Sequence, residues 1–441
     1  MTLAGILAHG LGGRVDLPVP RWMFVFGAGT ALVVSFVALA SLWREPRFEG
    51  RAERRGRPSA VQGILTDRTL EWTIRMLSLG FFVVVTVASF LPLSPTETIG
   101  PVVVFIWFWV GLAFAQAFVG NLWATLSPFD TLGRLLGFDE SEREPTREYP
   151  KRWGAWPAVI LLFGFVWLEL ADPFADRPGT LGYAIAGYTL ITMGGMAVYG
   201  RRSWTQHGEA FAVYLGLFAK MAPLTRDPDG FVVGRPPLAG LARLEPKPGR
   251  LALILVALGS TTFDGFSRSS LWGDWSGSLT GLPETFAETA GLLGTILVVG
   301  GLYALAMQAA GRITGEGWHV PAVRFAHSLV PIAFAYVVAH YFSFLLIEGQ
   351  IGIARLSDPF DRGWNLFGTA DRLVNLTLLS ATTIWYAQVV AIVAGHIGGV
   401  ILAHDRAIAI YPPGVALRTQ YALLAVMIVF TATGLLILSG G

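Results

Sequence analysis

The chain has 441 residues, of which 53% are hydrophobic and 14% charged, and its mean hydropathy is +0.56. This apolar content exceeds that of soluble domains and excludes both a soluble globular enzyme and a disordered chain. The net charge of +2 argues against a nucleic-acid-binding protein, and the absence of Cys excludes disulfides and cysteine-held metal clusters. The remaining class is a polytopic membrane protein whose main partner is the lipid bilayer.

Apolar runs of about 20 residues, the length of a helix that crosses a bilayer, occur about ten times along the chain. The predicted spans are 22–43, 72–92, 100–119, 154–171, 180–199, 250–265, 286–311, 322–346, 373–403 and 416–438. We expect helices, because a lipid-exposed backbone must satisfy its own hydrogen bonds and the alternating pattern of a closed barrel does not occur. The predicted fold is an all-α transmembrane bundle of about ten spans that forms a single domain over residues 1–441.

The distribution of Lys and Arg predicts the orientation, because these residues collect in cytoplasmic loops. In the predicted arrangement, 24 of the 32 Lys and Arg fall in one alternating set of loops. These loops are 44–71, 120–153, 200–250, 312–325 and 404–418. We therefore expect them to be cytoplasmic, with both termini outside the inner (plasma) membrane. Residues 1–21 form an outer segment without the basic start of a signal peptide, so the first span is interpreted as an uncleaved anchor.

Three segments on the expected cytoplasmic side have their own character. Residues 120–136 continue the third span and carry aromatic residues suited to the membrane interface, and residues 208–224 are apolar but too short to cross. Both are predicted to be interfacial or re-entrant helices. Residues 225–249 are rich in Pro and charge, which is typical of a solvated cytoplasmic loop.

Four histidines lie in two predicted spans, and ionisable side chains at membrane depth mark a functional site by default. His327 and His340 belong to the eighth span, about 20 Å apart along an ideal helix, with Pro331 expected to kink the helix between them. His396 and His404 belong to the ninth span and share a helical face. Because the two spans run in opposite directions, His396 is expected roughly level with His327.

These histidines and nearby acids define two candidate sites. The inner set is His327, His396, His404 and Asp405; the outer set is His340 and Asp264, joined from the N-terminal segment by His9 and Asp16. Neutral imidazoles and carboxylates can hold Zn or another divalent transition metal, and a histidine pair can hold haem. Simpler interpretations stay open: packed histidines in the inner set, an ion pair of Asp264 with Arg268, and an ordered terminus for His9 and Asp16.

Several stretches of the chain resemble an actinobacterial multi-span membrane family known as fenitrothion hydrolase. The stretches are 9–20 (HGLGGRVDLPVP), 120–123 (GNLW), 208–211 (GEAF), 263–265 (FDG), 339–343 (AHYFS) and 395–406 (GHIGGVILAHDR). The resemblance extends over most of the chain. It implies hydrolysis of a phosphorothioate triester with release of a nitrophenol, a reaction that metal-activated water can perform.

The first functional hypothesis is therefore a metal-dependent hydrolase of organophosphate-like esters, with Asp264 and His340 in catalysis and a lipophilic substrate that enters from the bilayer. A permease for a metal ion, a proton or a small solute is the first alternative. A haem-binding electron carrier with His327 and His396 as axial ligands is the second. The third is a structural subunit of a membrane complex, with residues 120–136 and 208–224 as docking surfaces.

Overall fold

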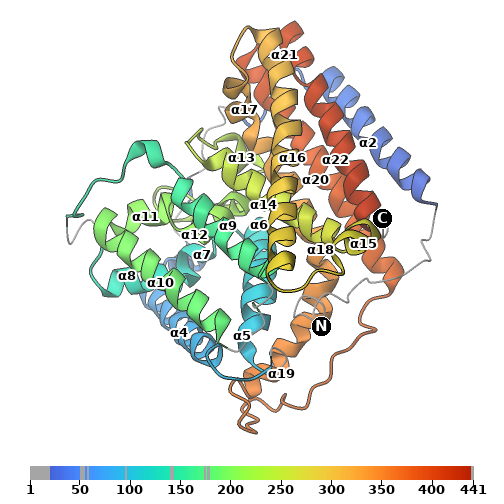
Figure 1. Cartoon of the computed structure of the whole chain (residues 1–441). Helices are drawn as coiled ribbons and strands as arrows, with labels where there is room; N and C mark the ends of the chain where they lie inside the picture. The colour runs from blue at the N-terminus through green and yellow to red at the C-terminus, as the bar shows by residue number, and fades with distance from the viewer. Residues whose placement is uncertain are drawn as a thin grey trace.

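The computed structural model describes residues 20–49, 55–56, 59–94, 97–139, 144–172, 175 and 179–438. Within these residues the regular structure is helical, apart from one antiparallel hairpin of strands β1 (Leu224–Arg226) and β2 (Val232–Gly234). Figure 1 shows the helices gathered into a bundle, with α2 and α22 side by side along one edge. The all-α fold predicted from the sequence is confirmed.

Eight helices or helical runs in the described chain are long and apolar enough to cross a membrane. They are α2 (Arg21–Leu42), α4 (Arg68–Ala88), α5 with η1 and α6 (Ile99–Pro101, Val102–Leu112, Ala113–Val119), α10 (Thr180–Tyr199), α16 (Leu282–Thr314), α17 to α19 (His319–Phe325, η3 Ala326–Leu329, α18 Val330–Ile347, η4 Glu348–Gln350, Ile351–Ser357), α20 (Ala381–Ile410) and α21 with α22 (Pro413–Thr419, Tyr421–Leu438). The protein is therefore an integral membrane protein.

The two other predicted spans correspond to α9 (Trp156–Leu170) and α14 (Arg250–Ser267). With 15 residues, α9 is about 22 Å long, which is short of a hydrocarbon core of roughly 30 Å. With 18 residues, α14 is nearly long enough, and most of its side chains are buried in the bundle. The number of crossings therefore stays a prediction.

Short helices connect the spans. They are α3 (Ala60–Leu65), α7 (Trp123–Leu126), α8 (Pro128–Leu135), η2 (Lys151–Trp153), α11 (Arg201–His207), α12 (Ala210–Ala219), α13 (Ala239–Ala242) and α15 (Ser270–Ser276). The segment predicted over 120–136 becomes α7 and α8, and the segment over 208–224 becomes α12. Residues 225–249 contain part of the hairpin and α13, so this predicted loop has more regular structure than expected.

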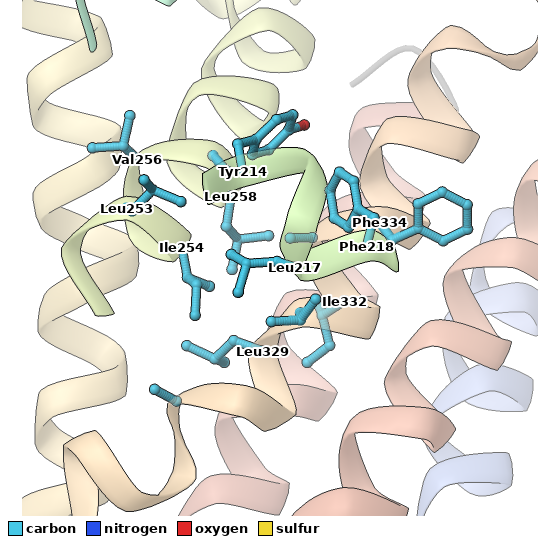
Figure 2. Packing of buried hydrophobic residues seen from close by; sticks show 14 of the residues in the cluster. Tyr214, Leu217, Phe218, Leu253, Ile254, Val256, Leu258, Leu329, Ile332 and Phe334 are labelled. Carbon is cyan, nitrogen blue, oxygen red and sulfur yellow. The ribbon is translucent and has the colours of Figure 1, made fainter. Parts of the chain in front are cut away.

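Helix α12 lies inside the bundle. Eight of its ten residues are buried. Figure 2 shows Tyr214, Leu217 and Phe218 of α12 packed with side chains from α14 and with Ile332 and Phe334 of α18. The sequence predicts an interfacial or a re-entrant helix here, and burial of α12 inside the bundle agrees with a re-entrant helix.

Loops that the sequence assigns to the same side contact one another. Hydrogen bonds join the segment 43–49 to 404–406, Gln62 to Val232, and Arg201 to Phe138. We call this the basic end of the bundle. At the opposite end, hydrogen bonds join Trp107 to Gly349 and Gln350 to Asn375. Figure 1 places α17 and α21 at one end and α19 at the other. Which end faces the cytoplasm stays a prediction.

Two expectations about the eighth and ninth spans differ from the structure. Pro331 does not kink a continuous helix; it lies in the first turn of α18, where a missing N–H costs little, and the 3₁₀ turn η3 precedes it. Helix α20 begins at Ala381 instead of residue 373, because the Ser380 side chain caps it by accepting a hydrogen bond from Thr383 N. It continues past residue 403 to Ile410.

Candidate functional site

Asp264 and His340 come together between α14 and α18. Asp264 Oδ2 lies 2.7 Å from His340 Nε2 and accepts a hydrogen bond from the Tyr341 hydroxyl at 2.7 Å. Asp264 Oδ1 accepts a hydrogen bond from Arg268 Nη2 at 2.8 Å. Asp264 is only 4% exposed, so its carboxylate is surrounded by these protein groups and not by solvent. Both contacts considered from the sequence, with His340 and with Arg268, therefore exist at once.

The cluster around Asp264 has a clear division of roles. Arg268 lies one helical turn beyond Asp264 on α14 and balances its charge within that helix. Tyr341 and His340 both belong to α18, so they join α18 to α14. Glu169 of α9 is close enough to interact electrostatically with Asp264 and Arg268. This arrangement holds a carboxylate, an imidazole and a guanidinium together inside the bundle.

His327 and His396 do not form the expected level pair. Gly399 of α20 packs against the Ser328 carbonyl and Gly395 against the Pro331 carbonyl. This register places His396 near Pro331, roughly one helical turn, or about 5 Å, from the level of His327. His396 instead has Tyr336 as a ring neighbour, with 6.1 Å between centroids.

Each of these two rings has a hydrogen bond at Nδ1, and His327 also interacts with the backbone of Leu402 in α20. The Nδ1 atoms lie 3.1 Å from Arg324 O for His327 and 2.9 Å from Ile392 O for His396, both on their own helices. Both Nε2 atoms are buried without a hydrogen-bond partner among the described residues. The interpretation as packed histidines accounts for the Nδ1 contacts. It does not account for the buried Nε2 atoms.

His404 and Asp405 hold the segment that follows α2. His404 has Nδ1 3.1 Å from Gln420 Oε1 and Nε2 3.0 Å from Trp43 O. The Asp405 carboxylate accepts four hydrogen bonds, at 2.6 to 3.1 Å, from the Trp43 indole and from the backbone N–H groups of Arg47, Phe48 and Glu49. The ligand atoms of both residues are thus used within the protein, as expected for a structural role.

The described residues contain no group of three or more His, Asp or Glu side chains that could hold a metal ion. Asp264 and His340 provide two ligands, and the Arg268 guanidinium places a positive charge against the first of them. His9 and Asp16 lie outside the described residues. Among the described residues the structure thus brings together two of the ligands that a transition-metal centre would need, and Zn and haem stay predictions.

A basic cavity at the basic end was not predicted from the sequence. Its volume is about 960 Å³, and it lies among α4, α7, α8, α11, α12 and the β1–β2 hairpin. Its basic lining residues are Arg134, Arg201, Arg202, Lys220, Arg226, Arg235 and Arg250, and its acidic ones are Asp67, Glu71 and Asp130. The sequence signal for it is the density of Lys and Arg in 200–250, which by itself predicts only the orientation of the chain.

Asp130 is the centre of an ion network on one wall of this cavity. Its carboxylate pairs with Arg75 at 2.9 Å, with Arg134 at 2.9 Å and with Arg201. Burial alone would raise the pKa of Asp130, but the hydrogen bonds and charges of Arg134 and Arg201 hold it below its ordinary value. Arg201 pairs in addition with Asp139 at 2.5 Å. These arginines are therefore largely balanced within the protein.

Comparisons with protein-family models, with curated proteins and with solved structures gave no match. The fold and the two polar regions define the class: a helical integral membrane protein with a buried Asp264–His340 cluster and a separate basic cavity. Any functional conclusion therefore rests on the chemistry of these residues.

Replacing Asp405 by alanine is expected to release the segment 43–49 from α20. Four donors lose their acceptor, and we expect a loss of about 1–3 kcal/mol in the free energy of unfolding. Trypsin should cleave at Arg44 and Arg47 faster in the Asp405→Ala protein, measured by mass spectrometry of digests in detergent. The matched control is Asp274→Ala, at an exposed acid.

Unchanged cleavage at both arginines would contradict this structural role of Asp405. A metal role for the same carboxylate makes a different prediction: treatment of the unmodified protein with EDTA would then accelerate cleavage as much as the substitution does.

Proposed function

We propose that this chain is a proton-coupled membrane permease in which the Asp264–His340 pair exchanges the proton. The observation that carries the proposal is the 2.7 Å separation of Asp264 Oδ2 and His340 Nε2 inside the bundle. Ionisable residues between membrane helices are costly, and they typically mark pathways for ions or protons.

The contacts of the pair suggest how a proton changes the protein. Imidazole is the side chain whose charge ordinarily changes in the physiological pH range. When His340 carries a proton, α14 and α18 are joined by an ion pair; when the proton leaves, the Tyr341 hydrogen bond remains and Arg268 still balances Asp264. Protonation therefore alters the strength of one helix contact without leaving an unpaired charge. A contact of this kind can bias a bundle between two arrangements.

The environment of His340 supports proton exchange at this residue rather than at Asp264. The side chain of His340 is 14% exposed and that of Asp264 is 5% exposed. Arg268 and Tyr341 both donate hydrogen bonds to the carboxylate. His340 is thus the more exposed member of the pair, although its Nε2 atom, which faces the carboxylate, is buried.

A hydrolase is the second candidate, since a carboxylate that orients an imidazole is the arrangement by which proteins activate water. The resemblance to the fenitrothion hydrolase family favours it as well. A triester substrate would need space beside His340, whereas the cavity of about 960 Å³ is lined by neither Asp264 nor His340. We place the permease first because the pair joins two helices inside the bundle, where ionisable groups typically mark pathways for ions or protons.

The test uses purified full-length protein in vesicles that enclose a pH-sensitive dye. A panel of small organic anions and cations is added outside, and the pH change inside is recorded with and without an imposed pH gradient. We expect at least one solute to drive a proton flux that falls to the rate of protein-free vesicles in Asp264→Asn and His340→Gln. The control His319→Gln removes an exposed histidine and should retain the flux.

The same preparations are incubated with a phosphorothioate triester, and nitrophenol release is followed by absorbance. Release that requires both Asp264 and His340, together with no solute-dependent proton flux, would favour the hydrolase over the permease. Flux that persists unchanged in both variants would overturn the assignment of the proton site.

A further inference from the structure

The basic cavity contains cationic groups that the protein itself does not neutralise. Its three acids are already engaged: Asp67 caps α4 by accepting a hydrogen bond from Leu70 N, Glu71 pairs with Arg75, and Asp130 pairs with three arginines. None of them is available for Lys220 or Arg250. The wall of the cavity that contains Lys220 and Arg250 therefore carries an excess of positive charge.

Lys220 is the clearest unneutralised group. It follows the last residue of α12, lines the cavity, and has no hydrogen bond or ion pair from its side chain to any described residue. Burial lowers the pKa of Lys220, and the positive charges of Arg235 and Arg250 lower it further, while the charge of Glu245 offsets only part of this effect. The ammonium is thus held in an unfavourable environment that an anion would relieve.

Arg250 adds a second donor to the same space. It is the first residue of α14, and its Nη1 contacts a backbone carbonyl, that of Glu245, while its Nε is buried without a partner among the described residues. The N-terminus of α14 has no side-chain cap. A cation at a helix N-terminus is unfavourable, and an anion there is favourable. The unpartnered Nε of Arg250 and the uncapped N-terminus of α14 both favour an anionic hydrogen-bond acceptor between Lys220 and Arg250.

Much of the remaining lining is apolar, beside a smaller number of uncharged polar residues. Leu122, Val213 and Leu217 contribute to the walls, and α12 brings two of these into the cavity. A volume of about 960 Å³ lies at the upper end of the range for small-molecule sites. The occupant that fits both parts has an anionic head for the cations and an apolar body for the remaining walls.

We propose that this cavity binds a phosphate-bearing amphiphile, with Lys220 and Arg250 as the groups that contact the phosphate. Ammonium and guanidinium groups together suit a phosphate, which offers several acceptor oxygens and up to two negative charges. This site is separate from Asp264 and His340, so it does not depend on the proposed proton exchange. The phosphate can come from a lipid head group or from a soluble organic phosphate.

The test measures binding to the purified full-length protein. Octyl phosphate is the soluble probe, octyl glucoside is the uncharged control with the same chain, and binding is measured by isothermal titration calorimetry in detergent. The lipid arm uses nanodiscs of phosphatidylcholine with or without phosphatidic acid, and the readout is retention of phosphatidic acid after extraction into detergent, by mass spectrometry.

We expect octyl phosphate to bind and octyl glucoside not to bind. Lys220→Gln and Arg250→Gln should each weaken the binding of octyl phosphate about tenfold or more, since each removes a charge-assisted hydrogen bond. Lys220→Arg should retain most of the binding, which separates the loss of a contact from a failure to fold. Arg312→Gln removes an exposed cation outside the cavity and should change nothing.

Retention of phosphatidic acid that is lost in Lys220→Gln, with weak binding of octyl phosphate, would support a lipid as the occupant. Binding of octyl phosphate without retention of the lipid would support a soluble organic phosphate. Equal binding of octyl phosphate and octyl glucoside, or equal affinity of the unmodified protein and Lys220→Gln, would overturn the proposal.

Discussion

Replacing Asp130 by alanine should destabilise the protein more than any other single change at the basic end. The substitution leaves Arg75 and Arg201, which are 3% and 5% exposed, without the carboxylate that they share with Arg134. Removing one partner of a buried ion pair typically costs about 3–5 kcal/mol, because the remaining charge is buried without compensation. Arg75 keeps Glu71 and Arg201 keeps Asp139, so we expect the lower part of that range.

The measurement is thermal unfolding of purified protein in detergent, followed by tryptophan fluorescence. Asp371→Ala, at an exposed acid, is the control and should unfold within about 0.5 kcal/mol of the unmodified protein. Asp130→Asn keeps the shape of the side chain without its charge and should lose nearly as much as the alanine variant. A change of less than about 1 kcal/mol in Asp130→Ala would contradict a stabilising role of the network.

The same network has a defined pH dependence. The pKa of Asp130 is lowered in the folded protein, so the unfolded chain takes up the proton at a higher pH than the folded one. Its contribution to the free energy of unfolding is therefore present above the ordinary pKa of 3.8 and is lost as the pH falls through the lower folded value.

Replacing Gly395 by alanine should separate α18 from α20. A Cβ at this position would overlap with the Cβ of Ala335 and lie 2.6 Å from the Pro331 carbonyl oxygen, so the two helices must move apart. Overpacking of this kind costs roughly 1–3 kcal/mol or more, which outweighs the gain of about 1 kcal/mol in helix propensity. We expect a lower midpoint of thermal unfolding in detergent.

Gly294→Ala in α16 is the matched control, because a Cβ there meets nothing within 4 Å. That variant should unfold at the same temperature as the unmodified protein or slightly higher. If Gly395→Ala and Gly294→Ala behave alike, close approach of α18 and α20 at Gly395 is not a requirement of the fold.

The length of apolar runs predicts most of the helices, because the hydrocarbon thickness sets a minimum that few other segments reach. The same counting predicts that Asp264 and His340 lie at similar depth, because each is near the end of a span and the two spans run in the same direction. Depth alone does not determine the pairing of His327 with His396. Their relation depends on the register of α20 against α18, which glycine contacts at Gly395 and Gly399 set.

The basic cavity could not be predicted for a different reason. Its lining comes from segments between residues 67 and 250 that are far apart in the sequence. The sequence does not show which of the basic residues in these segments form ion pairs and which do not. Arg201 and Lys220 both add to the count of basic residues in 200–250. Only the structure shows that Arg201 is paired with two aspartates while Lys220 has no such partner. His404 and Asp405 show the converse, since a pattern suited to a metal serves to hold a loop.

The pairing of Arg134 and Arg201 with Asp130 also bears on how the chain enters the membrane. Orientation is decided during insertion by Lys and Arg, and aspartate contributes little to that decision. The arginines therefore direct topology while the nascent chain is still unpaired, and they become part of a neutral contact after folding. We therefore expect a chain without Asp130 to be inserted in the same orientation as the unmodified chain and to lose stability only at a later step, when the helices assemble within the bilayer.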